Sequence, residues 1–220
     1  MSVFTPVTPE QLSVWLKFYR LGTLVRMQGI AAGIENTNYF VTATGGSYVL
    51  TLFEKLTPTE LPLYLGLMAH LAQRGIPSPA PAIDVQGRMF SELNGKPAAL
   101  MTRLQGEVVA APTPAHCSQV GVTLAEIHLT GQSYAGRLEN PRGPRWWREA
   151  ASKVNPFLDA ARAELLRSEL EFQLQHRRVD LPRGPIHADF LRDNVLFAGA
   201  RIGGVIDFYF AGIDCLLFDV

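Results

Sequence analysis

One polar stretch late in the chain constrains the fold more than any other feature. Within residues 186–197, Asp189 precedes Asn194 by five positions, and Asp207 follows that asparagine by thirteen. Apolar runs lie between these polar residues, which indicates two short strands joined by a turn at 198–200. We therefore expect Asn194 and Asp207 at neighbouring ends of one hairpin, next to the loop that carries Asp189.

This spacing is typical of a phosphotransfer site. Asp189 would orient an acceptor hydroxyl and accept its proton as the phosphoryl group leaves ATP. Asn194 and Asp207 offer oxygen ligands, which Mg²⁺ prefers. His187 is expected to brace the loop from behind. Arg192 would neutralise the phosphoryl group or a substrate carboxylate, or else be a solvated surface arginine.

The motif resembles the aminoglycoside phosphotransferase and choline kinase branch of the protein-kinase-like fold, in which His-x-Asp is followed by four residues and Asn. Within that branch it looks most like the bacterial homoserine kinases, and the likeness extends upstream to residues 33–41 and 48–54. The resemblance implies a two-lobed α+β fold with an antiparallel sheet lobe and a mainly helical lobe. It also implies ATP- and Mg²⁺-dependent phosphorylation of the L-homoserine hydroxyl, the kinase step towards threonine.

The composition is that of a globular chain: 220 residues, 47% hydrophobic and 18% charged, are enough to bury a core. Twenty basic and twenty acidic side chains cancel, so no bulk field recruits nucleic acid or an anionic membrane. We found neither a membrane span nor a signal peptide, and expect a cytoplasmic protein with a small-molecule partner. Cys117 and Cys215 have no disulfide or zinc spacing. The oligomeric state is not predicted.

Residues 1–102 read as the sheet lobe. Thr8 and Gln11 form a capping box that opens a helix, and Thr57 and Glu60 form a second one before the main helix. Glu60 could instead be the acidic residue that kinases keep on this helix. A five-stranded antiparallel sheet is expected from segments of strand-like composition at 24–27, 38–42, 48–53, 82–85, 88–90 and 98–102.

A loop of small residues between the first two strands is the candidate nucleotide cover, because its backbone could approach phosphates closely. Glycines in a turn are often only structural, and it is the position ahead of the polar loop that favours the functional interpretation. The candidate residues of this loop are Gly29, Gly33, Asn36 and Asn38. The resemblance further implies that backbone groups near Met101 and Arg103 line a purine cleft.

One position departs from the kinase pattern. The resemblance places Thr51 where kinases carry a lysine that holds the α- and β-phosphates, and a threonine has no charge to offer. Lys55 or Arg26 could supply that charge, but no spacing argument selects either of them.

Residues 103–220 read as the helical lobe. Helices are expected to begin at Thr113-Pro114 and Asn155-Pro156 and to pack below the polar loop. His128 is expected to be a satisfied interior histidine. Trp146 and Trp147 are adjacent on a helix, so at most one can face a cleft. The resemblance implies further helices beyond residue 220, so we expect an incomplete lobe. Asp214 and Asp219 either cap or tether the missing part or have a purely structural role.

Two alternatives stay open. The acceptor could be choline, an aminoglycoside or a sugar: an amino acid needs a cation for its carboxylate, choline an aromatic cage, and an aminoglycoside a carboxylate-rich pocket. The chain could also be a catalytically silent nucleotide-binding module, given Thr51. Against this, Asp189, Asn194 and Asp207 are all intact.

Overall fold

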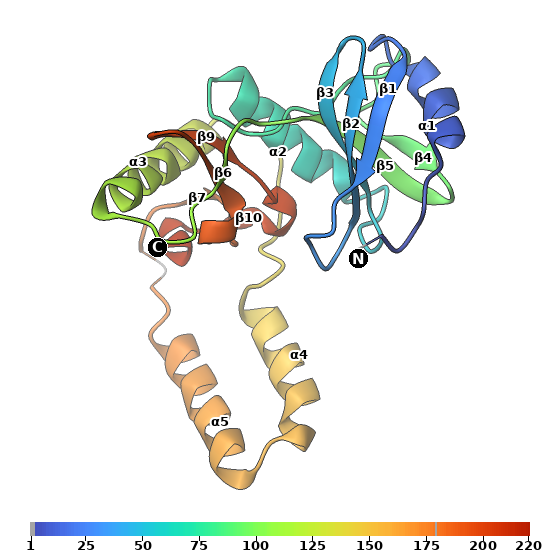
Figure 1. The fold of residues 1–220 in the computed structure, drawn as a ribbon. Helices are drawn as coiled ribbons and strands as arrows, with labels where there is room; N and C mark the ends of the chain where they lie inside the picture. The colour runs from blue at the N-terminus through green and yellow to red at the C-terminus, as the bar shows by residue number, and fades with distance from the viewer. Residues whose placement is uncertain (1–2, 179) are drawn as a thin grey trace.

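The computed structural model describes residues 3–178 and 180–220. Its first half is built around one sheet in the order β1-β2-β3-β5-β4, in which every neighbouring pair is antiparallel. Figure 1 shows this sheet at one end of the molecule, with the N-terminal helix beside it. The predicted five-stranded antiparallel sheet is confirmed. Its strands are β1 (Leu24–Gly29), β2 (Thr37–Ala43), β3 (Gly46–Leu52), β4 (Ser91–Leu93) and β5 (Lys96–Thr102).

Residues 82–90 do not form the two strands that their apolar composition favoured. The buried carboxylate of Asp84 accepts the N–H groups of Gln86 and Arg88 at 2.8 and 2.9 Å, and it also pairs with the Arg88 guanidinium at 2.8 Å. These bonds fold the segment into a turn, which Gly87 completes at φ +81°. The prediction was wrong because the buried Asp84 carboxylate binds backbone N–H groups that a strand would have used for pairing. The fourth strand begins only at Ser91.

Two helices flank the sheet. In α1 (Pro9–Trp15) the predicted capping box between Thr8 and Gln11 is present. The main helix, α2 (Leu61–Gln73), begins three residues later than a Thr57 cap would place it. Glu60 nonetheless folds back, and its carboxylate accepts from the N–H and hydroxyl of Thr57 at 2.9 and 2.7 Å. The capping role of Glu60 is thus the one observed.

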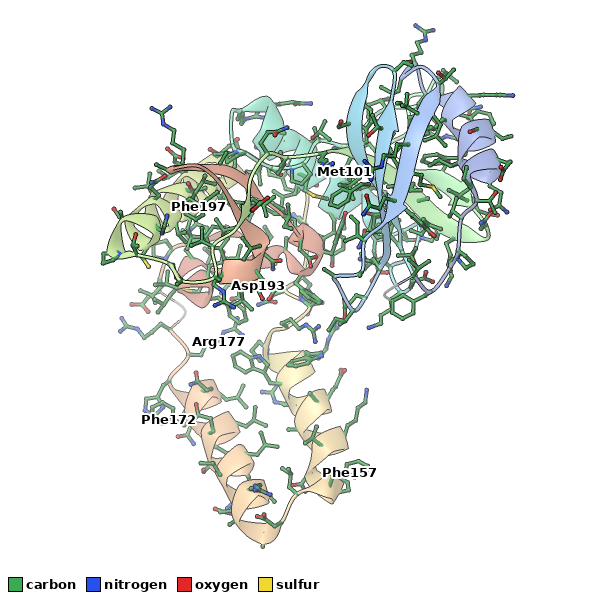
Figure 2. The ribbon with its side chains drawn as sticks, viewed as in Figure 1. Met101, Phe157, Phe172, Arg177, Asp193 and Phe197 are labelled. Atoms are coloured by element: carbon green, nitrogen blue, oxygen red, sulfur yellow. The ribbon has the colours of Figure 1, made fainter. Side chains whose placement is uncertain are left out.

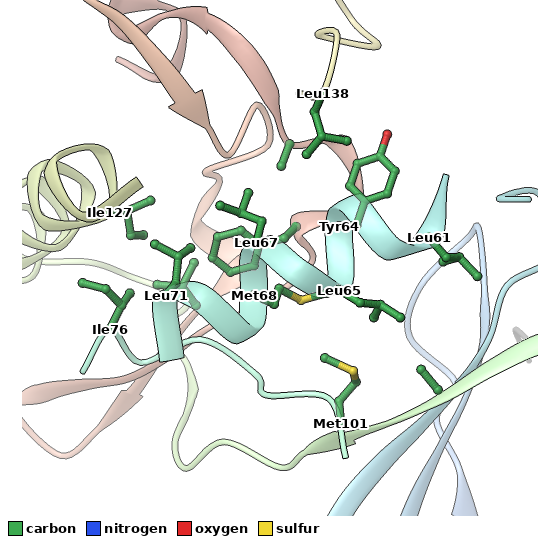
Figure 3. Close-up of a cluster of buried hydrophobic side chains, with 14 of the residues drawn as sticks. Leu61, Tyr64, Leu65, Leu67, Met68, Leu71, Ile76, Met101, Ile127 and Leu138 are labelled. Atoms are coloured by element: carbon green, nitrogen blue, oxygen red, sulfur yellow. The ribbon is translucent and has the colours of Figure 1, made fainter. Parts of the chain in front are cut away.

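Helix α2 joins the two halves of the chain through a shared core. Figure 3 shows its side chains meeting Met101 from the sheet on one side and Ile127 and Leu138 from the second half on the other. Phe208, which follows Asp207 directly, lies fully buried in the same cluster. The position of Asp207 therefore depends on packing around α2.

The second half combines one long helix with two small sheets. Helix α3 (Pro114–Gly131) begins at the predicted Thr113 cap, and it packs against β7. One sheet pairs β10 with β7, and the other has the order β6-β8-β9. The strands are β6 (Glu107–Val108), β7 (Arg183–Ile186), β8 (Val195–Ala198), β9 (Arg201–Val205) and β10 (Gly212–Cys215).

A helical hairpin of α4 (Pro144–Val154) and α5 (Ala160–Gln175) extends away from this body (Figure 1). Neither helix buries a residue, and Phe157 at its far end is 87% exposed (Figure 2). The helix predicted from Asn155-Pro156 begins instead at Ala160, behind an Asp159 cap. Its predicted packing below the polar loop is therefore wrong, and only α3 packs there.

A search of the helices in the described residues found none with the length and hydropathy of a membrane span.

Candidate active site

The hairpin of β8 and β9 brings Asn194 and Asp207 to one end, as the sequence predicted. Val195 pairs with Val205, and the Ile206 N–H donates to the Asn194 carbonyl at 2.9 Å. Asp207 itself lies in the left-handed region at φ 66° and ψ 53°, where a non-glycine residue is uncommon. That conformation turns the chain from the hairpin into the short helical turn Phe208–Phe210.

Asn194 fixes the Asp189 carboxylate. Its amide Nδ2 donates to the Asp189 carbonyl oxygen at 2.8 Å and to Asp189 Oδ2 at 2.9 Å. The donor end of the amide is thereby used within the loop, which leaves its carbonyl oxygen to accept or to coordinate. One side chain thus orients the candidate base and offers a candidate metal ligand.

His187 joins the loop to the hairpin. The ring is fully buried, and its Nδ1 accepts the Asp189 N–H at 3.3 Å, so Nε2 carries the proton that is donated to the Ile206 carbonyl at 3.0 Å. Burial lowers the pKa of His187, which favours this neutral form. The ring also packs against Phe208 with 4.4 Å between centroids.

Asp219 anchors the same loop, a role that the sequence analysis missed. Its buried carboxylate accepts the N–H groups of His187 and Ala188, each at 2.7 Å, and the Nε2–H of His128 at 2.8 Å. Ala188 is held at φ 61°, an unfavourable conformation that needs such support. These contacts agree with the structural alternative for Asp219, and His128 is the satisfied interior histidine that was predicted.

Asp214 is also buried rather than directed at further chain. It accepts from Asn140 Nδ2 at 2.9 Å and pairs with Arg177 at 2.7 Å and Arg183 at 3.0 Å. Figure 2 shows Arg177 where the chain returns from the hairpin to the body. Asp214 therefore holds the two ends of the α4–α5 hairpin at the base of the site.

The cleft concentrates negative charge. Desolvation by the surrounding protein, together with the nearby carboxylates of Asp189 and Glu35, raises the pKa of Asp207 to about 6. The residue nonetheless remains exposed to solvent. Carboxylates gathered in this way, next to the free oxygen of Asn194, form a donor set that suits a hard divalent cation.

No group of three or more His, Cys, Asp or Glu side chains in residues 3–178 and 180–220 could hold a metal alone. Mg²⁺ does not require such a group, because it is bound by one or two protein oxygens together with substrate phosphates and water. The Asn194 and Asp207 pair fits that mode of binding.

The small-residue loop connects β1 to β2 and leans towards the second half. The Ile30 N–H donates to the Asn38 carbonyl at 2.9 Å, which closes the loop, and Gly33 at φ +98° adopts a conformation that favours glycine. Glu35 at its tip pairs with Lys55 at 3.1 Å and lies 3.9 Å from Arg142. Gly29 ends β1, and the Asn36 carbonyl accepts a long bond of 3.5 Å from Asn38.

The position of the expected lysine is occupied by a neutral hydrogen-bond network. The buried Thr51 hydroxyl donates to Asn38 Oδ1 at 2.8 Å, and the Tyr209 hydroxyl interacts with Thr51. Lys55 is engaged by Glu35, and Arg26 donates to Gln28 at 3.0 Å on the surface.

Three candidate residues are not brought to the cleft as side chains. Met101 is buried in the α2 core. The Arg103 guanidinium lies over the Phe40 ring at 4.1 Å, and the backbone N–H of Arg103 donates to the Ser47 carbonyl. Arg192 donates to the Ala110 carbonyl at 3.0 Å and pairs with its neighbour Asp193, so its position supports the surface role and not the catalytic one.

An antiparallel sheet joined through one helix to a second half with this loop and hairpin defines a protein-kinase-like phosphotransferase fold. A family model described as the phosphotransferase enzyme family, APH, matches residues 26–220. The chain belongs to this family.

Several relatives of this chain share the name homoserine kinase. A homoserine kinase of Methylobacillus flagellatus is 52% identical over 220 residues, which cover 100% of this chain and 69% of the relative. A homoserine kinase of Paraburkholderia phytofirmans is 48% identical, with 100% and 70% covered.

Solved structures share the fold at low identity. An amicoumacin kinase in complex with AMP-PNP and Ca²⁺ has a TM-score of 0.77 and 18% identity, with 97% of this chain and 67% of that chain covered. A spectinomycin phosphotransferase in complex with ADP has a TM-score of 0.70 and 18% identity, with 98% and 73% covered. At this identity the likeness concerns the fold alone.

Proposed function

We propose that this protein is a homoserine kinase, which transfers the γ-phosphoryl group of ATP to the hydroxyl of L-homoserine and releases O-phospho-L-homoserine. The observation that carries the proposal is the contact of Asn194 with the Asp189 carboxylate, beside Asp207 in one acidic cleft. The names of the relatives at 52% and 48% identity support the choice of acceptor.

Each residue has a role that follows from its contacts. Asp189 orients the acceptor hydroxyl and accepts its proton, while His187 and Asp219 keep its loop in place. Asn194 and Asp207 would hold Mg²⁺, which offsets charge on the β- and γ-phosphates when bound. The loop from Gly29 to Asn38 covers the nucleotide.

The division into residues 1–102 and 103–220 belongs to the proposal, as do a cytoplasmic location and the purine cleft near residues 101–103. The N–H groups of Thr102 and Arg103 already donate to Ala80 and Ser47. A purine edge in this cleft would therefore have to use backbone groups other than these two donors.

A panel of acceptors tests the proposed function. With MgATP, the purified chain is expected to phosphorylate L-homoserine in preference to choline, an aminoglycoside or a sugar, measured as transfer of labelled phosphate to each acceptor. Transfer to choline or an aminoglycoside but not to homoserine would remove the proposed acceptor. Transfer to none of them would favour the silent nucleotide-binding module.

The substitution Asp207→Asn tests the metal assignment. Loss of this anionic ligand is expected to raise the half-saturating Mg²⁺ concentration at least about tenfold, measured by titrating Mg²⁺ at fixed ATP. Asp180→Asn is the matched control, because that carboxylate is exposed and forms its ion pair with Arg178. Coincident Mg²⁺ titrations for Asp207→Asn and the wild type would contradict the assignment.

A further inference from the structure

Arg142 presents an unusually well-oriented guanidinium at the edge of the cleft. It lies over the Phe210 ring at 4.2 Å and over the Trp146 ring at 4.7 Å. Two aromatic rings fix the plane of the guanidinium without using its N–H donors. Phe210 follows the candidate metal ligand Asp207 by three residues, so the arginine is held against the turn that carries that ligand.

The backbone that carries Arg142 is fixed as well. The Arg142 N–H donates to Asn140 Oδ1 at 2.9 Å, and the buried Asn140 donates through Nδ2 to Asp214 at 2.9 Å. Gly212 allows this close packing, because a Cβ there would lie 2.5 Å from Asn140 Cα. The guanidinium is therefore presented by a buried, hydrogen-bonded loop.

The donors of this guanidinium are largely unused. Its one ion pair among the described residues is with Glu35 at 3.9 Å, which is beyond hydrogen-bonding distance, and the side chain is 33% exposed. The same Glu35 raises the pKa of Asp207, so the arginine, the loop tip and the metal turn lie around one cleft. Figure 1 shows α4 beginning below the junction of the two halves.

We propose that Arg142 is an oxyanion receptor of the active site, which binds the carboxylate of the amino-acid acceptor or the transferring phosphoryl group through its planar pair of N–H donors. This proposal rests on the proposed function and adds the residue that recognises the substrate. Arg142 also supplies, from across the cleft, a cation in a site where Thr51 provides none.

Kinetics of Arg142→Ala with two acceptors test the proposal. The second acceptor is 3-aminopropan-1-ol, which is homoserine without its carboxylate. If the ligand is the carboxylate, KM for homoserine should rise about 10- to 100-fold, and the preference for homoserine over the amino alcohol should disappear. The Kd of MgADP, measured by calorimetry, should then change less than about twofold.

If the ligand is the phosphoryl group, the results differ. The variant should lose about 10- to 100-fold in kcat with both acceptors equally, and the affinity for Mg-AMP-PNP should fall more than that for MgADP. Either pattern supports an oxyanion receptor and identifies the oxyanion.

Arg145→Ala is the matched control. Arg145 lies three residues further along the chain, in the first turn of α4, and its pair with Glu139 at 3.4 Å is 72% exposed on both sides. Values of kcat, KM and Kd in Arg142→Ala that equal those of Arg145→Ala would overturn the proposal.

Arg142→Lys decides the question if Arg142→Ala unfolds early in a thermal melt. A lysine keeps the charge but cannot donate in a planar pair, so it should still lose about tenfold in the affected constant. Wild-type constants in Arg142→Lys would overturn the proposal. If the wild type does not phosphorylate homoserine, the proposed function fails. Comparing the affinities for Mg-AMP-PNP and MgADP in the wild type and in Arg142→Ala then still tests whether Arg142 binds the phosphoryl group.

Discussion

Asp189→Asn is expected to lower kcat for phosphoryl transfer by about 10²- to 10⁴-fold, because an amide cannot accept the proton of the acceptor hydroxyl. The loop should keep its shape, since Asn194 also donates to the main-chain carbonyl of residue 189 at 2.8 Å. Nucleotide affinity should therefore change little. Steady-state kinetics with homoserine and calorimetry with MgADP measure the two quantities separately.

Asp193→Asn provides the control for this result. Asp193 lies in the same loop, but its side chain is 73% exposed and pairs with Arg192, so its substitution should leave kcat within about twofold of the wild type. Equal rates for the wild type and Asp189→Asn would remove Asp189 as the base and leave the cleft without a proton acceptor of known position.

Asp219→Ala should have the largest effect on stability. The substitution removes a buried acceptor of two backbone N–H groups and of His128, all at 2.7 or 2.8 Å. Leaving such donors unpaired should lower the free energy of unfolding by about 3 kcal/mol or more. The kcat should fall too, because Ala188, which directly precedes Asp189, loses the hydrogen bond that holds its backbone in place. Urea unfolding and steady-state kinetics measure the two effects.

Asp159→Ala gives a comparison for this variant. Asp159 caps α5 at an exposed position, and its loss should cost about 1 kcal/mol without changing kcat. Asp219→Asn keeps one acceptor oxygen and should fall between the wild type and Asp219→Ala. An unfolding curve for Asp219→Ala that overlays the wild-type curve would show that the loop does not depend on this carboxylate.

The spacing of residues in the sequence correctly predicted the structural features that depend on residues close together in the chain. The hairpin that presents Asn194 and Asp207 and the caps at Thr8 and Thr113 each depend on residues a few positions apart. The β1–β2–β3 meander follows from alternating strands and short connections. Patterns of this kind fix a hydrogen bond or a face, so the sequence alone indicates them.

The sequence was less informative where contacts between residues far apart in the chain determine the structure. For Asp219 and Asp214 the sequence left a structural role and a tethering role open, and it could not name the partners at 128, 187 and 140 that bind them. For Arg192 the sequence left a catalytic and a surface role open, and it could not show that the guanidinium donates to the Ala110 carbonyl. Arg142 had no motif at all, because its orientation comes from two rings and a loop that only the fold assembles.

The pairing of β7 with β10 bears on how the molecule is made. The sheet of the first half is complete once residue 102 has been synthesised, since its strands pair with one another along that segment. β7 must wait for residues 212–215, and the loop after it must wait for Asp219, 31 and 32 residues downstream of the N–H groups that this aspartate holds. During synthesis, therefore, the first sheet can assemble early, whereas the loop that carries Asp189 can be fixed only after residue 219 has emerged.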